Sequence, residues 1–217
     1  MKSCKLCGKI GVNSKTCPLN KNCTNPHPRK HYKSPIPYNY ETYNNYKLNI
    51  YDEPLQPCGD KSMKYGSWDN EYKCSELDGG VHQICINNIS KSTPKFSELT
   101  GQSNWSDKRG SDNHCVCLGA WSLYNAKYNK QKEKKNIKCD AIPKISLSNR
   151  YVNKFTQGWN KWNNNEIPDQ IVYGVESIVN NCYTGDKKSR KLKKNYCNFA
   201  KQNNQLNKTK FYKNMCN

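Results

Sequence analysis

The chain of 217 residues carries 36 Lys and Arg against 17 Asp and Glu, a formal net charge of +19, and only 34% of its residues are hydrophobic. This length fits one domain, or one domain with a small appendage. The composition excludes a collagen and a coiled coil, and no stretch approaches the roughly 20 apolar residues that a membrane-spanning helix needs.

The excess of positive charge has two explanations that the sequence leaves open. Lys, Asn and Tyr are the residues that AT-rich codons encode, so genome drift accounts for much of the lysine content. A net charge this high nevertheless attracts polyanions and speeds their encounter with the protein. The expected partner is nucleic acid, and the alternative is basicity without a dedicated partner.

The 13 cysteines are many, and their number is odd. Residues Met1 to Lys9 carry Cys and Lys and lack the apolar core of a secretory signal, so we expect an intracellular chain that is not secreted. In that setting reduced thiols, metal ligation or both are favoured over disulfides.

Residues 1–31 form a head that is dense in cysteine and histidine. Its first three cysteines follow the spacing C-x2-C-x9-C, which lets the first two sulfurs reach one metal ion from a tight turn. The spacing resembles a zinc knuckle, although Val12 stands where the knuckle has its ligand histidine. A later cysteine or histidine would supply the fourth ligand, or else the site is a remnant with free thiols. The candidate ligands of one zinc ion are Cys4, Cys7 and Cys17, with Cys23, His27 or His31 as the fourth.

A spacer at 32–50 leads into a compact body at 51–184. In chain order, the patterns predict a strand at 81–86, a short helix from Thr93 to Leu99, a helix at 116–128, a strand at 137–141 and a helix at 169–182. The last of these is the clearest, because its apolar residues recur at helical spacing behind a proline and an aspartate. That apolar face consists of Ile171, Val172, Val175, Ile178, Val179 and Cys182.

Residues 185–217 form a basic tail that we expect to be a mobile arm or a weak helix. Lysines in the head and the tail are the candidate contacts to phosphate groups, because such contacts need positive charge and no particular sequence. The candidate nucleic-acid-binding residues are Lys2, Lys5, Lys9, Lys15, Lys187, Lys188, Arg190, Lys191, Lys193 and Lys194.

The body holds a second group of cysteines and histidines. Three interpretations stay open for it: buried structural cysteines, a zinc or copper site, and a thiol nucleophile activated by a histidine. The last two predict a thiol- or metal-dependent enzyme, as the alternative to a binding protein. The residues concerned are His82, Cys85, His114, Cys115 and Cys117.

Several short motifs of the body occur in the same order as in a known domain family. They are Leu55-Gln56-Pro57-Cys58, Gly80-x-His82-x-x-Cys85, then Phe96, Gly101 and Asn104, and Cys115-x-Cys117-x-x-x-Trp121. In this order the body resembles the domain family of unknown function catalogued under the number 2237. The resemblance implies a fold and carries no reaction.

The whole chain, with its knuckle-like head and its richness in Asn and Lys, resembles proteins of giant DNA viruses of the mimivirus kind. The expected fold is α+β: a small mixed domain with a zinc-knuckle-like head and a basic C-terminal tail. The expected function is non-specific nucleic-acid binding with zinc, in the host cytoplasm or the viral factory. Packaging in the virion with viral structural proteins is compatible with it, and no membrane or small-molecule substrate is expected.

Overall fold

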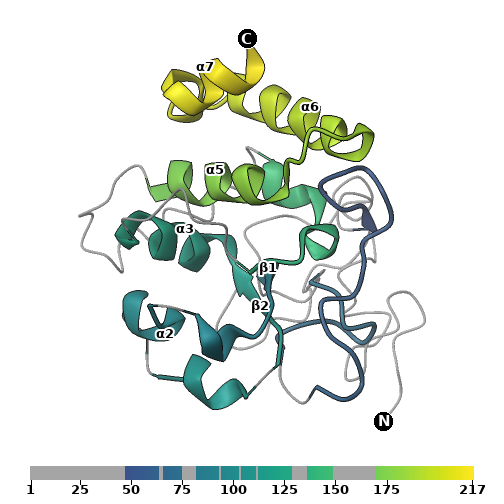
Figure 1. Cartoon of the computed structure of the whole chain (residues 1–217), viewed down its shortest axis with the longest axis vertical. Helices are drawn as coiled ribbons and strands as arrows, with labels where there is room; N and C mark the ends of the chain where they lie inside the picture. Colours follow the sequence, from purple (N-terminus) through teal and green to yellow (C-terminus); the bar gives the residue numbers. More distant parts are fainter. Residues whose placement is uncertain are drawn as a thin grey trace, which may run out of the picture.

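The structure is a computed structural model in which the body and the C-terminal region form one arrangement of helices around a small sheet (Figure 1). It describes residues 47–63, 66–74, 82–92, 94–102, 104–110, 112–128, 136–148 and 170–217. The head at 1–31 and the spacer up to residue 46 lie outside the described residues, and so do the zinc ligands and lysines predicted there. The expectation of an α+β fold is confirmed.

Two antiparallel strands, β1 (His82–Ile86) and β2 (His114–Cys117), form the sheet. Ile84 belongs to the main hydrophobic core, whereas Cys85 belongs to a smaller second cluster on the other side of the strand. This follows from the alternation of side chains along a strand. Cys85 lies directly opposite Cys115 in the register. The first predicted strand is therefore confirmed, and both of its faces are buried.

Helix α3 (Leu118–Lys127) follows β2 and packs against α5 (Gln170–Cys182). The indole Nε1 of Trp121 donates a hydrogen bond to the carbonyl oxygen of Gly174, 3.1 Å away. A Cβ atom built on Gly174 would lie 2.0 Å from the hydroxyl oxygen of Ser122. The two helices therefore approach each other at a place where only glycine fits.

Helix α5 confirms the helix predicted at 169–182. All of its predicted apolar face is buried except Val172, which is half-buried. The helix predicted at 116–128 begins later, at Leu118, because the residues before it form β2. The strand predicted at 137–141 is wrong: Ile137 makes one isolated bridge, and the chain then turns where Cys139 forms a disulfide with Cys182.

The other elements between β1 and α5 are short. The helix predicted from Thr93 is reduced to one turn at Phe96–Leu99, and Gly101 follows it with a positive φ of 69°. Pro143 pairs with Asn49 in an isolated bridge. The short elements are η1 (Ile89–Lys91), α2 (Phe96–Leu99), η2 (Ser106–Arg109), η3 (Cys139–Ala141) and η4 (Lys144–Leu147).

The C-terminal region is a folded helical hairpin, so of the two predicted alternatives the helix is confirmed and the mobile arm is wrong. It comprises α6 (Lys187–Lys201), η5 (Leu206–Lys208) and α7 (Lys210–Cys216), which lie beyond α5 at the top of Figure 1. Apolar residues recur through this lysine-rich stretch at helical spacing and join the main core, which anchors the hairpin. The anchoring residues are Leu192, Tyr196, Phe199, Ala200 and Leu206. None of the described helices is long and apolar enough to cross a membrane.

Candidate functional site

The solvent-facing side of α6 carries a row of cations. Its members are separated by three, one, three and seven positions, which at about 100° per residue places them within one stripe of the helix, opposite the residues that enter the core. All five are exposed. We call this stripe the α6 basic face, and it consists of Lys187, Arg190, Lys191, Lys194 and Lys201. From end to end it spans about 21 Å of helix axis.

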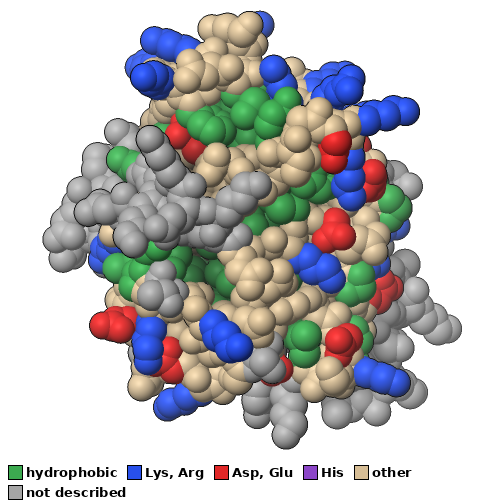
Figure 2. Space-filling model, in the orientation of Figure 1, with side chains coloured by type: hydrophobic (Ala, Val, Ile, Leu, Met, Phe, Trp, Pro, Cys, Tyr) green, Lys and Arg blue, Asp and Glu red, His purple; other side chains and the backbone are tan. Residues whose placement is uncertain are grey.

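The surface around this stripe is positive as well. The segment 187–217 contains ten Lys and Arg residues and no Asp or Glu. Figure 2 shows Lys and Arg side chains gathered along the upper part of the molecule, over α6 and α7. The exposed Lys208, Lys210 and Lys213 extend the charge beyond α6. An anion that approaches this end of the molecule therefore meets attraction over both helices.

The α6 basic face works against the stability of its own helix. Positive charges in a first turn oppose the helix macrodipole, and like charges four residues apart, such as Lys187 and Lys191, repel each other. The first turn contains no acidic residue, and Asp186 before it is the N-cap. Its carboxylate accepts a hydrogen bond from the backbone N–H of Ser189 at 2.7 Å. This bond, with a further one from Thr184, holds the pKa of Asp186 below its usual value.

Lys188, on one flank of α6, contacts residues of the body. The ammonium group of Lys188 lies 2.7 Å from the carboxylate of Glu53 and 4.8 Å from the ring centroid of Tyr51. The hydroxyl group of Tyr51 in turn donates to the carbonyl oxygen of Cys182 at 2.9 Å. Burial, aided by nearby carboxylates, raises the pKa of Tyr51 to about 12, so this hydroxyl keeps its proton at neutral pH. Lys188 therefore has an intramolecular partner and is set apart from the basic face.

A disulfide between Cys197 and Cys216 ties α7 to α6. Their Cα atoms are 5.6 Å apart, and no residue of α7 is fully buried. Glu176 of α5 is partly buried, and that burial raises the pKa of its carboxyl group. The hairpin is thus held to the body by its core residues and to itself by a covalent bond.

Most cysteines of the described residues are disulfide-bonded in this structure, where the sequence predicted reduced thiols, metal ligation or both; Cys117 is a reduced thiol. Six cysteines of the body and two of the C-terminal region form four disulfides: Cys58–Cys85, Cys74–Cys115, Cys139–Cys182 and Cys197–Cys216. The fold brings segments distant in the sequence to Cα separations of 5.5 to 5.7 Å, which suits a disulfide. This pairing could not be predicted from the sequence, because the spacing of cysteines alone does not define which of them bond.

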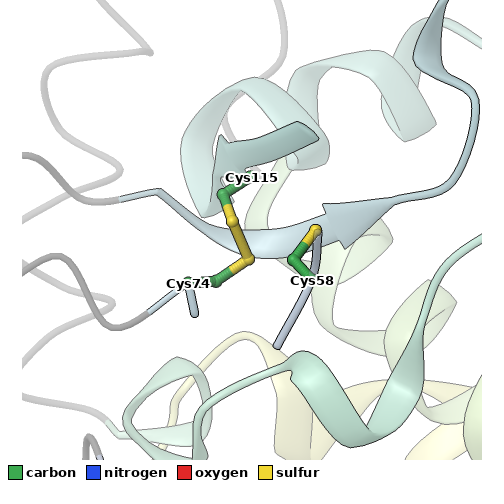
Figure 3. A group of neighbouring side chains, drawn as sticks. All are labelled: Cys58, Cys74 and Cys115. Atoms are coloured by element: carbon green, nitrogen blue, oxygen red, sulfur yellow. A yellow bond between two sulfur atoms is a disulfide. The ribbon is translucent and has the colours of Figure 1, made fainter. Parts of the chain in front are cut away.

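Two of these disulfides lie side by side and form the second core, which we call the cystine cluster: Cys58, Cys74, Cys85 and Cys115. The sulfur atoms of Cys58, Cys74 and Cys115 all lie within 4.8 Å of one another, a separation at which they could hold a metal ion (Figure 3). All four cysteines are at most 1% exposed. Trp68 packs against the cluster.

The predicted group of His82, Cys85, His114, Cys115 and Cys117 is brought together only in part. Cys85 and Cys115 face each other but bond to Cys58 and Cys74, which the sequence analysis did not select. As disulfides they have no thiolate for nucleophilic catalysis. Cys117 is a buried thiol whose sulfur accepts the N–H of Ala120 at 3.3 Å, as the N-cap of α3. The ring of His114 lies against that of Trp105, with 4.7 Å between centroids and an angle of 42° between the ring planes.

The chain matches no family model, and neither the curated proteins nor the solved structures yield a match. The resemblance to the family catalogued under 2237 and to proteins of giant viruses therefore stays a prediction.

Proposed function

We propose that the protein binds nucleic acid without sequence specificity through the α6 basic face. The observation that carries the proposal is the row of five exposed cations on a helix whose opposite side is anchored in the core. Disordered basic tails must be ordered on binding, at a cost in entropy, whereas this face is already in place. The unfavourable placement of cations in the first turn supports the same conclusion, because local rules of stability are broken most often at functional sites.

The chemistry of the face favours phosphate groups over bases. Four of its five cations are lysines, which act as point charges, while Arg190 is the one side chain able to form a bidentate contact. Phosphate contacts position a protein on nucleic acid and carry no sequence information. Affinity is therefore expected to depend on salt far more than on base sequence.

The expected salt dependence follows from the number of cations. If all five neutralise a phosphate, the slope of log K against log salt concentration is about −3.5 on single strands and about −4.5 on duplex DNA. Binding then weakens by about 100- to 500-fold between 50 and 200 mM salt. Fluorescence anisotropy with a labelled oligonucleotide at several salt concentrations measures this slope.

A pair of charge-matched variants tests the location of the site. The triple variant Lys187→Glu, Lys191→Glu, Lys194→Glu reverses three charges of the basic face, and should lose most of the affinity and flatten the salt slope. The control reverses three exposed lysines elsewhere on the body, so that both variants carry the same net charge. Equal losses in the two variants would show that net charge, and not the α6 basic face, controls binding. The control substitutions are Lys61→Glu, Lys108→Glu and Lys127→Glu.

Zinc in the head is a second part of the proposal. We infer from the C-x2-C-x9-C spacing that the head holds one zinc ion and adds the contacts of Lys2, Lys5, Lys9 and Lys15 to those of α6. Packaging in a virus particle would suit such a protein, whose charge would neutralise part of the genome. Changing Cys4 and Cys17 to Ser should remove one zinc ion in native mass spectrometry and weaken oligonucleotide binding.

A further inference from the structure

The cystine cluster differs from the two other disulfides because it contains four sulfur atoms instead of two. Its cysteines come from four segments of the chain, two of them from loops and two from the facing strands β1 and β2. Three of the sulfur atoms lie within 4.8 Å of one another, and the fourth, that of Cys85, is bonded to one of these three. The arrangement thus brings three potential soft ligands together and holds a fourth, Cys85, beside them through its bond to Cys58.

Such an arrangement is close to what a tetrathiolate zinc site requires. Zn–S bonds of about 2.3 Å in a tetrahedron put the sulfur atoms about 3.8 Å apart. Opening the two disulfides lets the bonded sulfur atoms move apart to that distance. The two other distances within the group, from the sulfur of Cys58 to those of Cys74 and Cys115, are at most 4.8 Å and need to shorten by no more than about 1 Å. The sulfur of Cys85, once released from Cys58, has to turn toward the same point. Rotation about side-chain bonds supplies movements of that size without displacing the backbone.

The surroundings hold the four segments in place independently of the disulfides. The backbone N–H of Cys58 donates to the carbonyl oxygen of Tyr72 at 2.7 Å, and that of Cys115 to Gly66, also at 2.7 Å. Trp68 leaves no room for a Cβ atom on Gly66, at 1.8 Å, so its ring is closely packed there. The scaffold would therefore keep four reduced cysteines close together.

One cation lies next to the cluster. The backbone N–H of Lys138 donates to the carbonyl oxygen of Cys85 at 3.0 Å, and its ammonium group donates to the carbonyl oxygen of Pro57 at 2.8 Å. Lys138 thus connects the segments that carry Cys58 and Cys85. Its charge would offset part of the negative charge that four thiolates and one zinc ion leave in a buried place.

We propose that the cystine cluster is a redox-controlled zinc site, with two disulfides in the oxidised protein and one tetrathiolate zinc ion in the reduced protein. A dithiol reductant transfers two electrons and two protons to each disulfide and leaves as its own cyclic disulfide. The four thiols release four protons when Zn²⁺ binds, and the site then carries a charge of −2. Both states link the same four segments, so the second core survives reduction.

The test uses the full chain with Cys4, Cys7, Cys17 and Cys23 changed to Ser, so that the head cannot contribute zinc. The protein is reduced with dithiothreitol, freed of reductant without air, and supplied with Zn²⁺. Native mass spectrometry should show one zinc ion in the reduced protein and none in the oxidised protein. A reduced protein that takes up no zinc would overturn the proposal.

Two variants in that background locate the ion. Cys74→Ser with Cys115→Ser removes two sulfurs from the cluster and should abolish zinc binding. Cys197→Ser with Cys216→Ser removes a disulfide outside the cluster and should leave one zinc ion bound. Retention of zinc by the first variant, or its loss from the second, would refute the assignment.

A spectroscopic measurement avoids the risk that the cluster variant does not fold. Co²⁺ added to the reduced background protein should give the intense d–d bands of a tetrahedral site and sulfur-to-cobalt charge transfer for four thiolates. Absence of these bands, or their full retention after Cys58→Ser, would contradict a site made by these four cysteines. None of these results depends on nucleic acid, so this proposal and the proposed function can fail separately.

Discussion

Gly174, where α5 packs against α3, offers a direct test of the main core. Replacing it with alanine places a methyl group 2.0 Å from the hydroxyl oxygen of Ser122 and 2.8 Å from the Cα and Cβ atoms of the same residue. Carbon atoms in favourable contact are about 3.5–4.0 Å apart. The side chain of Ser122 can rotate, but its Cα atom is backbone, so the helices have to separate by about 0.7 Å or more.

The cost of that separation can be estimated. Overpacking of this kind costs about 1–3 kcal/mol, and the hydrogen bond from Trp121 to the Gly174 carbonyl contributes about 1 kcal/mol that the shift would weaken. Alanine regains about 1 kcal/mol through its higher helix propensity. Gly174→Ala should therefore lower the free energy of unfolding by about 1–3 kcal/mol. A loss of 2 kcal/mol corresponds to a fall in Tm of about 4–8 °C for a chain of this length.

Thermal and urea unfolding followed by circular dichroism, under non-reducing conditions, measures this effect. Ser122→Gly removes the hydroxyl oxygen and the Cβ atom from the contact, so the double variant should recover part of the loss in a double-mutant cycle. At a helix position without such a close contact, replacing glycine with alanine would raise the free energy of unfolding. If Gly174→Ala raises the stability by about 1 kcal/mol, the close packing of α3 and α5 is wrong.

Three further predictions concern the hairpin and the neighbouring helix α5. Replacing Cys197 and Cys216 with serine opens a link between residues 19 apart, and should cost about 3 kcal/mol by the chain-entropy estimate; hydrogen exchange should rise in α7 first. Asp186→Ala should cost about 1 kcal/mol of stability by removing the N-cap of α6, measured by urea unfolding, whereas Asp186→Asn should cost little. Burial raises the pKa of Glu176 in the folded protein, so its contribution to stability falls as the pH rises through that pKa. Glu176→Gln should therefore raise the Tm at pH 7 and leave it unchanged near pH 3; equal shifts at both values would contradict the buried carboxylate.

The sequence by itself determined the elements that have a strong local signal. The apolar positions of α5 recur at helical spacing, so one face had to be buried whatever the rest of the fold. The strand β1 was predicted from a short segment of mixed polar and apolar residues at 81–86. Gly101, which follows the short helix α2, has a positive φ of 69°, a conformation that glycine adopts without strain.

Helix α6 could have been predicted from its apolar spacing and its N-cap, but its lysine-rich composition favoured a different interpretation. Leu192, Tyr196 and Phe199 follow the same helical spacing as the apolar face of α5, and Asp186 is a typical N-cap. The high lysine content favoured a disordered tail. In this region the position of three apolar residues decided the structure, and the number of charges did not.

Only the tertiary structure decided the cysteine chemistry. Whether two cysteines bond depends on the distance between their Cα atoms, and Cys74 and Cys115 are 41 residues apart in sequence but 5.5 Å apart in space. That proximity depends on the pairing of β1 with β2 and on the loops packed around Trp68. Neither leaves a periodic trace in the sequence, because long-range contacts are set by the packing of the whole chain.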